Sequence, residues 1–145
     1  MHTGVRYDMV DRRIDGFFYG LFMDRDILRE SQVVAENPRR AYVDGYALRI
    51  GRRATLVPSS QARVYGMVFA LTHDDLERLY SAPGLEQYRP EAVLAYSMEG
   101  DTLPALCYNL REAPGPDEAN TEYAARLRAV LGKLEFPPEY IASIS

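Results

Sequence analysis

Few side chains in this sequence can bind a metal or act as a covalent nucleophile. Its 145 residues include one cysteine, Cys107, two histidines and one lysine, Lys133. A structural zinc site takes four Cys or His ligands, more than the chain contains, and a Schiff base would have to form on Lys133, late in a predicted surface helix. The only Gly-Lys dipeptide is followed by Leu134, so the sequence contains no P-loop. We therefore predict no metal site and no cofactor.

Cys107 and His73 are the pair that could act as a thiol nucleophile and its base. Cys107 lies between Leu106 and Tyr108 in an apolar stretch, where a small buried thiol is the usual arrangement. His73 stands at the start of a predicted helix, where its side chain would face solvent. We interpret both as structural residues, which leaves the 21 acidic residues as the available source of acid–base chemistry.

The sequence around Gly20 predicts a strand that runs into a glycine turn. Residues 18–23 read Phe-Tyr-Gly-Leu-Phe-Met, a short apolar run broken by a glycine. Such a turn can direct successive backbone N–H groups into a concavity, which would suit a carboxylate or an oxyanion. The alternative is a buried strand with no ligand.

Strands and helices on both sides of this turn must position it. A continuous apolar run predicts a first strand that ends near residue 23. Alternating and continuous apolar runs predict five further strands, over residues 43–50, 54–57, 63–71, 88–98 and 102–110. Asp24 and Thr72 are predicted to cap helices over residues 25–34 and from residue 73 onward. One apolar stripe predicts a third helix over residues 121–135, and a last turn follows over residues 139–144.

This order of elements predicts an α+β fold. Its sheet is small, mixed and mainly antiparallel, curled into a barrel and flanked by a few helices. Six charged side chains among residues 1–15 predict a flexible N-terminal leader. Residues 16–145 would then form a single domain.

The charge pattern also limits the possible partners. The net charge is −4 and the sequence pI is about 5.2, so the broad positive field of a nucleic-acid-binding protein is missing. We find no signal peptide and no stretch near the roughly 18 apolar residues of a membrane span. We predict a cytoplasmic monomer or homodimer that binds neither nucleic acid nor membranes. The pairs Arg39-Arg40 and Arg52-Arg53 are either solvated turn residues or a clamp for a phosphate or carboxylate.

Several segments carry a further pattern. Tyr19-Gly20 follows the first strand, and residues 64–71 form an apolar strand that begins Val-x-Gly. Tyr88 begins the strand after the next turn, and residues 138–141 read Pro-Glu-Tyr-Ile. In this order and spacing they resemble the γ-glutamylcyclotransferase-like (AIG2-like) family, with Tyr108 in the place of the tyrosine of its Ser-Tyr-Leu motif. The resemblance covers about residues 16–144.

The resemblance implies the fold of that family and its reaction. In that reaction, the α-amine of a γ-glutamyl group attacks its own γ-carbonyl and releases 5-oxoproline and an amine. A glutamate in a Leu-Asp-x-x-Glu-Gly motif transfers the proton, and the Tyr-Gly loop holds the substrate with backbone amides. The resemblance thus implies a small γ-glutamyl or amino-acid-like ligand, no cofactor, and substrate-binding positions at Tyr19, Gly20, Leu21, Phe22, Tyr88 and Tyr108.

The sequence departs from the family pattern at the catalytic position. Aligned on Leu79 and Gly84, the glutamate of the motif falls on Pro83, which cannot transfer a proton. Glu86 is the nearest carboxylate and the predicted substitute base, and we expect Pro83 at the edge of the cavity. Small polar residues of the family loop become Leu21 and Phe22.

Three hypotheses about function follow, and whether the protein is an enzyme stays open between them. The first is a cyclotransferase that releases 5-oxoproline from γ-glutamyl amines or peptides. The second is a catalytically impaired relative that binds a small amino-acid-like carboxylate without turnover. The third is an interaction module.

Overall fold

The structure is a computed structural model, and it describes residues 12–145. Its strands are β1 (Arg13–Phe18), β2 (Glu36–Ile50), β3 (Ala54–Thr72), β4 (Tyr88–Ser97) and β5 (Thr102–Leu110). Its helices are η1 (Leu21–Met23, a 3₁₀ turn), α2 (Arg25–Glu30), α3 (His73–Leu79), α4 (Thr121–Lys133) and α5 (Pro138–Ser143). Within these residues, no helix combines the length and the apolar character needed to cross a membrane.

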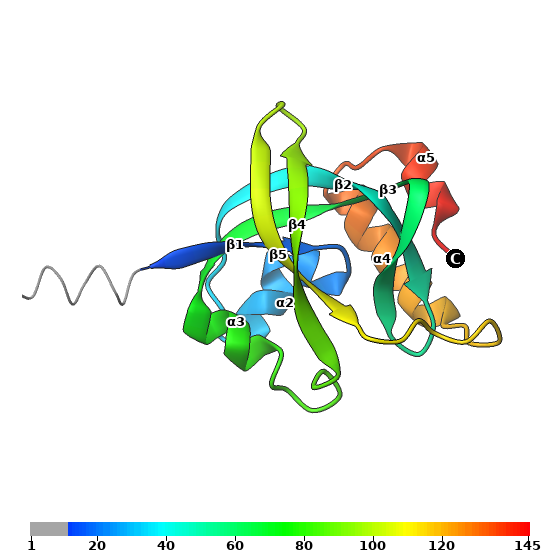
Figure 1. Cartoon of the computed structure of the whole chain (residues 1–145), viewed down its shortest axis with the longest axis horizontal. Helices are drawn as coiled ribbons and strands as arrows, with labels where there is room; N and C mark the ends of the chain where they lie inside the picture. The colour runs from blue at the N-terminus through cyan, green and yellow to red at the C-terminus, as the bar shows by residue number, and fades with distance from the viewer. Residues whose placement is uncertain (1–11) are drawn as a thin grey trace, which may run out of the picture.

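The strands close into a barrel in the order β1-β3-β2-β4-β5 (Figure 1). All neighbouring pairs are antiparallel except β1 and β5, which meet in parallel at Gly16 and Leu106. The barrel closes through few residue pairs, because β2 meets β4 at Ala41–Ser97 and Tyr42–Tyr96 and β1 meets β5 at a single pair. The predicted α+β fold with a curled, mixed and mainly antiparallel sheet is confirmed.

Strand β3 is longer than the sequence predicted. The two strands expected at residues 54–57 and 63–71 form one continuous strand, because β2 pairs with it from Ala54 to Ala70. Pro58 does not end the strand: it pairs with Tyr46 next to a register shift between Asp44 and Tyr46. Proline is tolerated at such an irregularity because the ladder hydrogen bond is already interrupted there.

The N-terminal boundaries also differ from the prediction. β1 begins at Arg13, so residues 13–15 of the expected leader pair with β3, and Arg39 binds the Asp15 carboxylate with N–O distances of 2.7 and 3.1 Å. The rest of that leader lies outside the described residues, apart from residue 12. β1 ends at Phe18 rather than near residue 23, and α2 ends at Glu30 rather than at Val34.

The three predicted helix starts agree with the structure. The Asp24 side chain accepts a hydrogen bond from the Asp26 N–H at 2.9 Å, and Thr72 accepts one from the Asp75 N–H at 3.1 Å. These caps satisfy backbone donors that a helix leaves unpaired at its first turn. α4 begins at Thr121, as its apolar stripe predicted.

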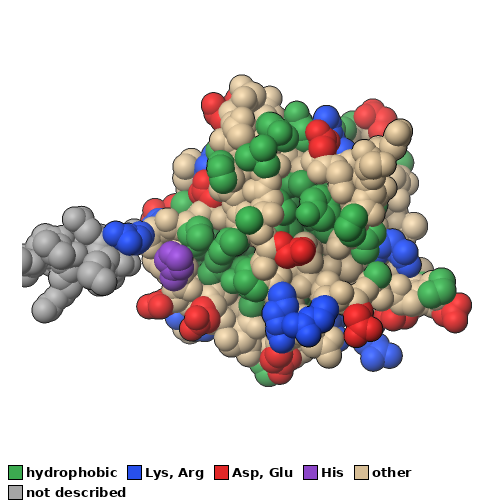
Figure 2. Space-filling model, viewed as in Figure 1, with side chains coloured by type: hydrophobic (Ala, Val, Ile, Leu, Met, Phe, Trp, Pro, Cys, Tyr) green, Lys and Arg blue, Asp and Glu red, His purple; other side chains and the backbone are tan. Residues whose placement is uncertain are grey.

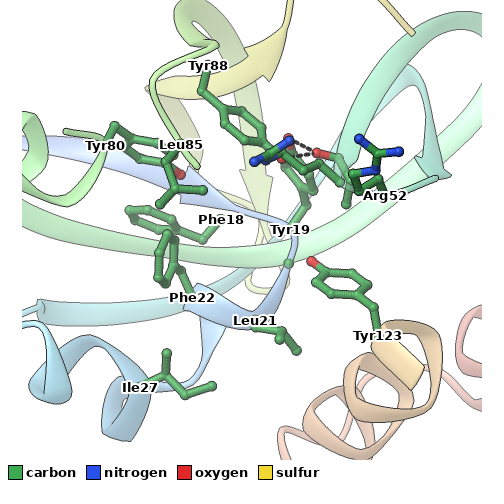
Figure 3. Close-up of a pocket in the computed structure, with 13 residues that line it drawn as sticks. Phe18, Tyr19, Leu21, Phe22, Ile27, Arg52, Tyr80, Leu85, Tyr88 and Tyr123 are labelled. Atoms are coloured by element: carbon green, nitrogen blue, oxygen red, sulfur yellow. Dashed lines mark hydrogen bonds between the residues drawn. The ribbon is translucent and has the colours of Figure 1, made fainter. Parts of the chain in front are cut away.

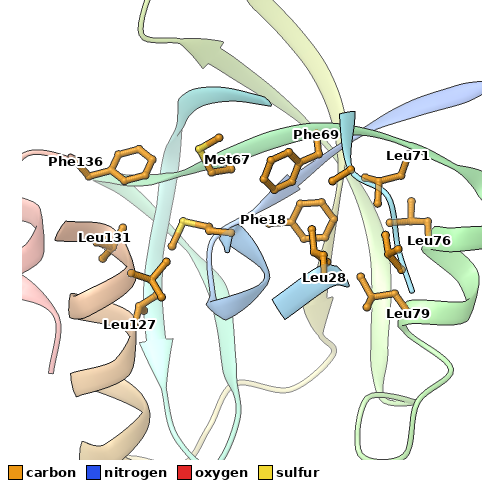
Figure 4. Packing of buried hydrophobic residues seen from close by; sticks show 14 of the residues in the cluster. Phe18, Leu28, Met67, Phe69, Leu71, Leu76, Leu79, Leu127, Leu131 and Phe136 are labelled. Atoms are coloured by element: carbon orange, nitrogen blue, oxygen red, sulfur yellow. The ribbon is translucent and has the colours of Figure 1, made fainter. Parts of the chain in front are cut away.

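The apolar stripe of α4 packs against one side of the barrel. Leu127 and Leu131 are fully buried, and they join a core cluster that includes Met67 and Phe69 of β3 (Figure 4). The same cluster continues to α3 through Leu76 and Leu79. Both helices are therefore held on the barrel by apolar packing, which places their ends around the Tyr-Gly turn.

Candidate functional site

A cavity of about 250 Å³ lies beside the Tyr-Gly turn (Figure 3). Four segments enclose it: the β1–η1 turn, the turn between β2 and β3, the end of α3 with the loop that follows, and the first turn of α4. Aromatic and aliphatic side chains make up most of its wall, with two arginines. The lining residues are Phe18, Tyr19, Gly20, Leu21, Phe22, Ile27, Arg52, Arg53, Ala54, Tyr80, Leu85, Tyr88 and Tyr123.

Gly20 lies at the point where the turn comes closest to α4. A Cβ atom at this position would lie 2.4 Å from the Tyr123 hydroxyl oxygen. Figure 3 shows that hydroxyl pointing toward the turn. The glycine is therefore required by the close approach of Tyr123, a residue that the sequence analysis placed only in the helix core stripe.

Two tyrosines close the base of the cavity by hydrogen bonds to the backbone. The Tyr19 hydroxyl donates to the Tyr108 carbonyl oxygen at 2.8 Å, and the Tyr88 hydroxyl donates to the Ala54 carbonyl oxygen. These bonds tie β1 to β5 and β4 to β3. Burial raises the pKa of Tyr19 well above its ordinary value, so its phenol stays protonated at neutral pH.

Tyr80 forms the wall of the cavity at the end of α3. Its ring stacks on Tyr108 with a centroid distance of 3.9 Å and an interplanar angle of 6°, and it meets Phe22 edge to face at 5.9 Å. Burial raises the pKa of Tyr80 well above its ordinary value. At neutral pH this side chain can donate a hydrogen bond but cannot accept a proton.

Tyr80 is not among the site residues predicted from the sequence, although a sequence pattern could have identified it. Residues 76–81 read Leu-Glu-Arg-Leu-Tyr-Ser, so a shift of three positions places Leu76 and Glu77 on the Leu-Asp of the family motif. In this register its glutamate position is Tyr80. The register matters because Tyr80 lines the cavity, whereas Pro83 is exposed and is not among the lining residues.

The other predicted site residues divide between two places. Tyr19, Gly20, Leu21, Phe22 and Tyr88 all line the cavity. Tyr108 stacks on Tyr80 in an adjoining outer groove, which Tyr80 and Tyr88 also line. The cavity predicted at residues 19–21 is thus present, without Pro83 at its edge.

Glu86 lies in that outer groove and not in the cavity. Its carboxylate is exposed and accepts the Gly84 N–H at 2.8 Å, and backbone hydrogen bonds, including this one, lower its pKa. A lowered pKa makes a carboxylate a weaker base. Its predicted role as a substitute base stays a prediction.

The polar groups of the cavity are therefore hydroxyls and guanidiniums. Arg52 and Arg53 line it, and no aspartate or glutamate does among the residues that the structure describes. Nor do any three metal-ligating side chains come together within residues 12–145. Such a lining can bind an anion but offers no carboxylate to accept a proton.

The two remaining sequence candidates lie away from the cavity. Cys107 is fully buried and burial raises its pKa to about 12, so the thiolate is absent at neutral pH. His73 is exposed at the start of α3, and the histidine drawn in Figure 2 lies at the surface. Both agree with the structural interpretation of these residues.

Replacing Gly20 with alanine is expected to destabilise the fold by about 1–3 kcal/mol, because the new methyl group meets the Tyr123 hydroxyl. In a Tyr123→Phe background most of that loss should disappear, since the phenyl ring lacks the oxygen and the next ring atom lies 3.8 Å away. Urea unfolding of the four proteins of this double-mutant cycle measures the coupling. Additive effects of the two substitutions would show that the contact does not constrain Gly20.

Comparison with known proteins identifies relatives of this fold. The sequence profile described as "Gamma-glutamyl cyclotransferase, AIG2-like" matches residues 16–126. A solved structure named "Gamma-glutamyl cyclotransferase" has a TM-score of 0.74 at 17% identity, and the match covers 92% of this chain and 89% of that one. An uncharacterized protein from Homo sapiens has a TM-score of 0.73 at 19% identity, with 93% and 89% covered.

A third solved structure, YkqA from Bacillus subtilis, has a TM-score of 0.76 at 21% identity. The match covers 94% of this chain and 55% of YkqA, so this chain spans about half of that protein. No curated protein sequence matches the chain.

Proposed function

This chain belongs to the gamma-glutamyl cyclotransferase, AIG2-like family, and we propose that its cavity binds a small amino-acid-like carboxylate ligand without releasing 5-oxoproline. One observation carries the proposal: the described residues that line the cavity include two arginines and several tyrosines but no aspartate or glutamate. The scaffold of the family is thus combined with a cavity of different chemistry.

The reaction that the family carries out needs two proton transfers. A base takes a proton from the attacking α-amine, and an acid returns one to the leaving nitrogen. Tyr80 occupies the cavity wall where the shifted motif would place the glutamate, and its raised pKa leaves it without basic character at neutral pH. The absence of a base favours binding over turnover.

The catalytic alternative requires Glu86 to act from the outer groove. Its side chain accepts the Gly84 N–H and lies in the outer groove, so it would have to turn toward the cavity to reach a substrate. We therefore rank turnover second.

The proposal also includes a cytoplasmic location, with which the single thiol is consistent, and a monomeric or homodimeric state.

The wild-type protein is expected to release no 5-oxoproline from γ-glutamyl dipeptides or γ-glutamylamines above a protein-free blank. In the same buffer, 5-oxoproline itself, a small carboxylate, should raise the midpoint of thermal unfolding as its concentration increases, because a ligand that binds only the folded state stabilises it. Turnover that Glu86→Gln abolishes would overturn the proposal and identify Glu86 as the base.

A further inference from the structure

We propose that the ligand of this cavity is a carboxylic acid with an apolar or aromatic tail and no free α-ammonium group, and that Arg53 binds its carboxylate. This inference rests on the proposed function, because it assigns the ligand class of the same cavity. It differs from the γ-glutamyl group, whose zwitterionic head carries an ammonium beside its carboxylate.

The cavity wall provides apolar contacts and no partner for an ammonium. Phe18, Leu21, Phe22, Ile27 and Leu85 line it. No acidic side chain among the described residues lines the cavity. A buried ammonium without an anionic or carbonyl partner is strongly unfavourable, because it loses its water and gains nothing in return.

The backbone carbonyl at the base of the cavity is already engaged. The Ala54 carbonyl oxygen accepts a hydrogen bond from the Tyr88 hydroxyl, and the Tyr19 hydroxyl oxygen lies 3.5 Å from the same carbonyl oxygen. Burial also raises the pKa of both tyrosines, so neither supplies a phenolate to balance a positive charge. The cavity therefore disfavours a zwitterion and accepts an apolar chain.

Arg53 supplies the positive charge at the rim. Its guanidinium lies beside Gly84, where a Cβ atom would stand 3.1 Å from its Nη2 atom. Within residues 12–145 no hydrogen bond or ion pair engages this guanidinium, whereas Arg39 and Arg63 each pair with an aspartate. Glu86 lies near enough to Arg53 to feel its charge, but its carboxylate binds the Gly84 N–H and forms no ion pair with Arg53. An arginine that lines an apolar cavity without such an ion pair is suited to bind a carboxylate through paired N–H groups.

The turn that carries Arg53 is held in place from outside. Glu118 accepts the Arg52 N–H at 2.9 Å and the Gly115 N–H at 3.0 Å. Gly51 packs under this loop so closely that a Cβ atom would stand 2.5 Å from the Pro114 side chain. The loop after β5 thus fixes the backbone on which Arg53 is presented.

Arg126 provides the matched control. It lies in α4, the helix that also carries Tyr123, and it is exposed and not among the residues that line the cavity. Replacing Arg126 with glutamine changes the net charge as much as replacing Arg53 does. A general electrostatic attraction would therefore affect both variants.

The test compares three probes that share one phenylpropyl skeleton, by calorimetric titration of the full chain. 3-Phenylpropanoate has a carboxylate, phenylalanine adds the α-ammonium, and 3-phenylpropanamide removes the negative charge. We expect 3-phenylpropanoate to bind with an affinity at least about tenfold higher than that of phenylalanine or 3-phenylpropanamide. Arg53→Gln should remove the preference for the carboxylate over the amide, and Arg126→Gln should retain it.

Each other outcome has a separate meaning. If phenylalanine binds as tightly as 3-phenylpropanoate, the assigned ligand class is wrong while binding without turnover stands. If Arg126→Gln loses as much affinity as Arg53→Gln, Arg53 is not the carboxylate-binding residue. If none of the three probes binds at millimolar concentration but 5-oxoproline does, the assigned ligand class is wrong and the proposed function stands. Release of 5-oxoproline from γ-glutamyl compounds, by contrast, would overturn the proposed function itself.

Discussion

Tyr80→Glu is expected to raise the rate of 5-oxoproline release to about 10²–10⁴-fold above the wild-type background. The new carboxylate would stand in the cavity wall next to Phe22 and Tyr88. Burial among aromatic rings raises the pKa of a carboxyl group toward the working pH, which improves both its proton uptake and its proton return. The measurement is the initial rate of 5-oxoproline formation from γ-glutamylamines.

Two variants control this experiment. Tyr80→Gln has nearly the size and polarity of the glutamate variant but cannot transfer a proton, so it reports any effect of opening the cavity. Pro83→Glu places the carboxylate at the exposed position that the sequence alignment selected, and we expect it to stay inactive. Activity in Pro83→Glu but not in Tyr80→Glu would show that the original register is correct and that Tyr80 is not the position of the catalytic glutamate.

Gly66→Ala is expected to lower the free energy of unfolding by about 3 kcal/mol or more. A Cβ atom at Gly66 in β3 would lie 2.3 Å from the Phe18 carbonyl oxygen and 2.8 Å from the Phe17 ring. The first of these atoms belongs to the backbone of β1, which is paired with β3 and cannot move alone. Because β1 leads directly into Tyr19 and Gly20, the same displacement should weaken ligand binding.

Gly132→Ala is the matched control for this substitution. Gly132 lies in α4, and a Cβ atom there would have no neighbour within 4 Å. Alanine favours the helix over glycine, so this variant should be stabilised by up to about 1 kcal/mol. Urea unfolding curves of both variants measure the difference, and a Gly66→Ala protein as stable as wild type would contradict the close packing of β1 on β3.

Much of the fold follows from local sequence patterns. Asp24 and Thr72 cap helices because their side-chain oxygens reach backbone N–H groups two or three residues on, a contact that depends only on nearby residues. The stripe on α4 and the apolar strand around residues 63–71 likewise indicate which faces are buried. These features are local, so the sequence alone predicts them.

Strand continuity and the site itself depend on distant partners. Pro58 ends a strand in the sequence pattern, but β2 continues to pair past it, so β3 remains whole. Tyr80 directly follows α3, a position at which surface residues are common. Its stacking on Tyr108, a residue distant in the sequence, holds it in the cavity wall. The sequence allows two registers of the family motif around this helix, and only the structure distinguishes them, because it places Tyr80 in the cavity wall and Pro83 outside it.

The sequence by itself determined the scarcity of nucleophiles, the Tyr19-Gly20 turn and the likeness to one family, because residue type and order carry that information. The tertiary structure decided which charged side chains lie at the cavity beside the Tyr19-Gly20 turn. It places Glu86 in the outer groove, bound to the Gly84 N–H, and it brings Arg53 to the cavity. The physical reason is that the chemistry of the cavity depends on loops from β2–β3 and α3–β4, which only closure of the barrel brings together.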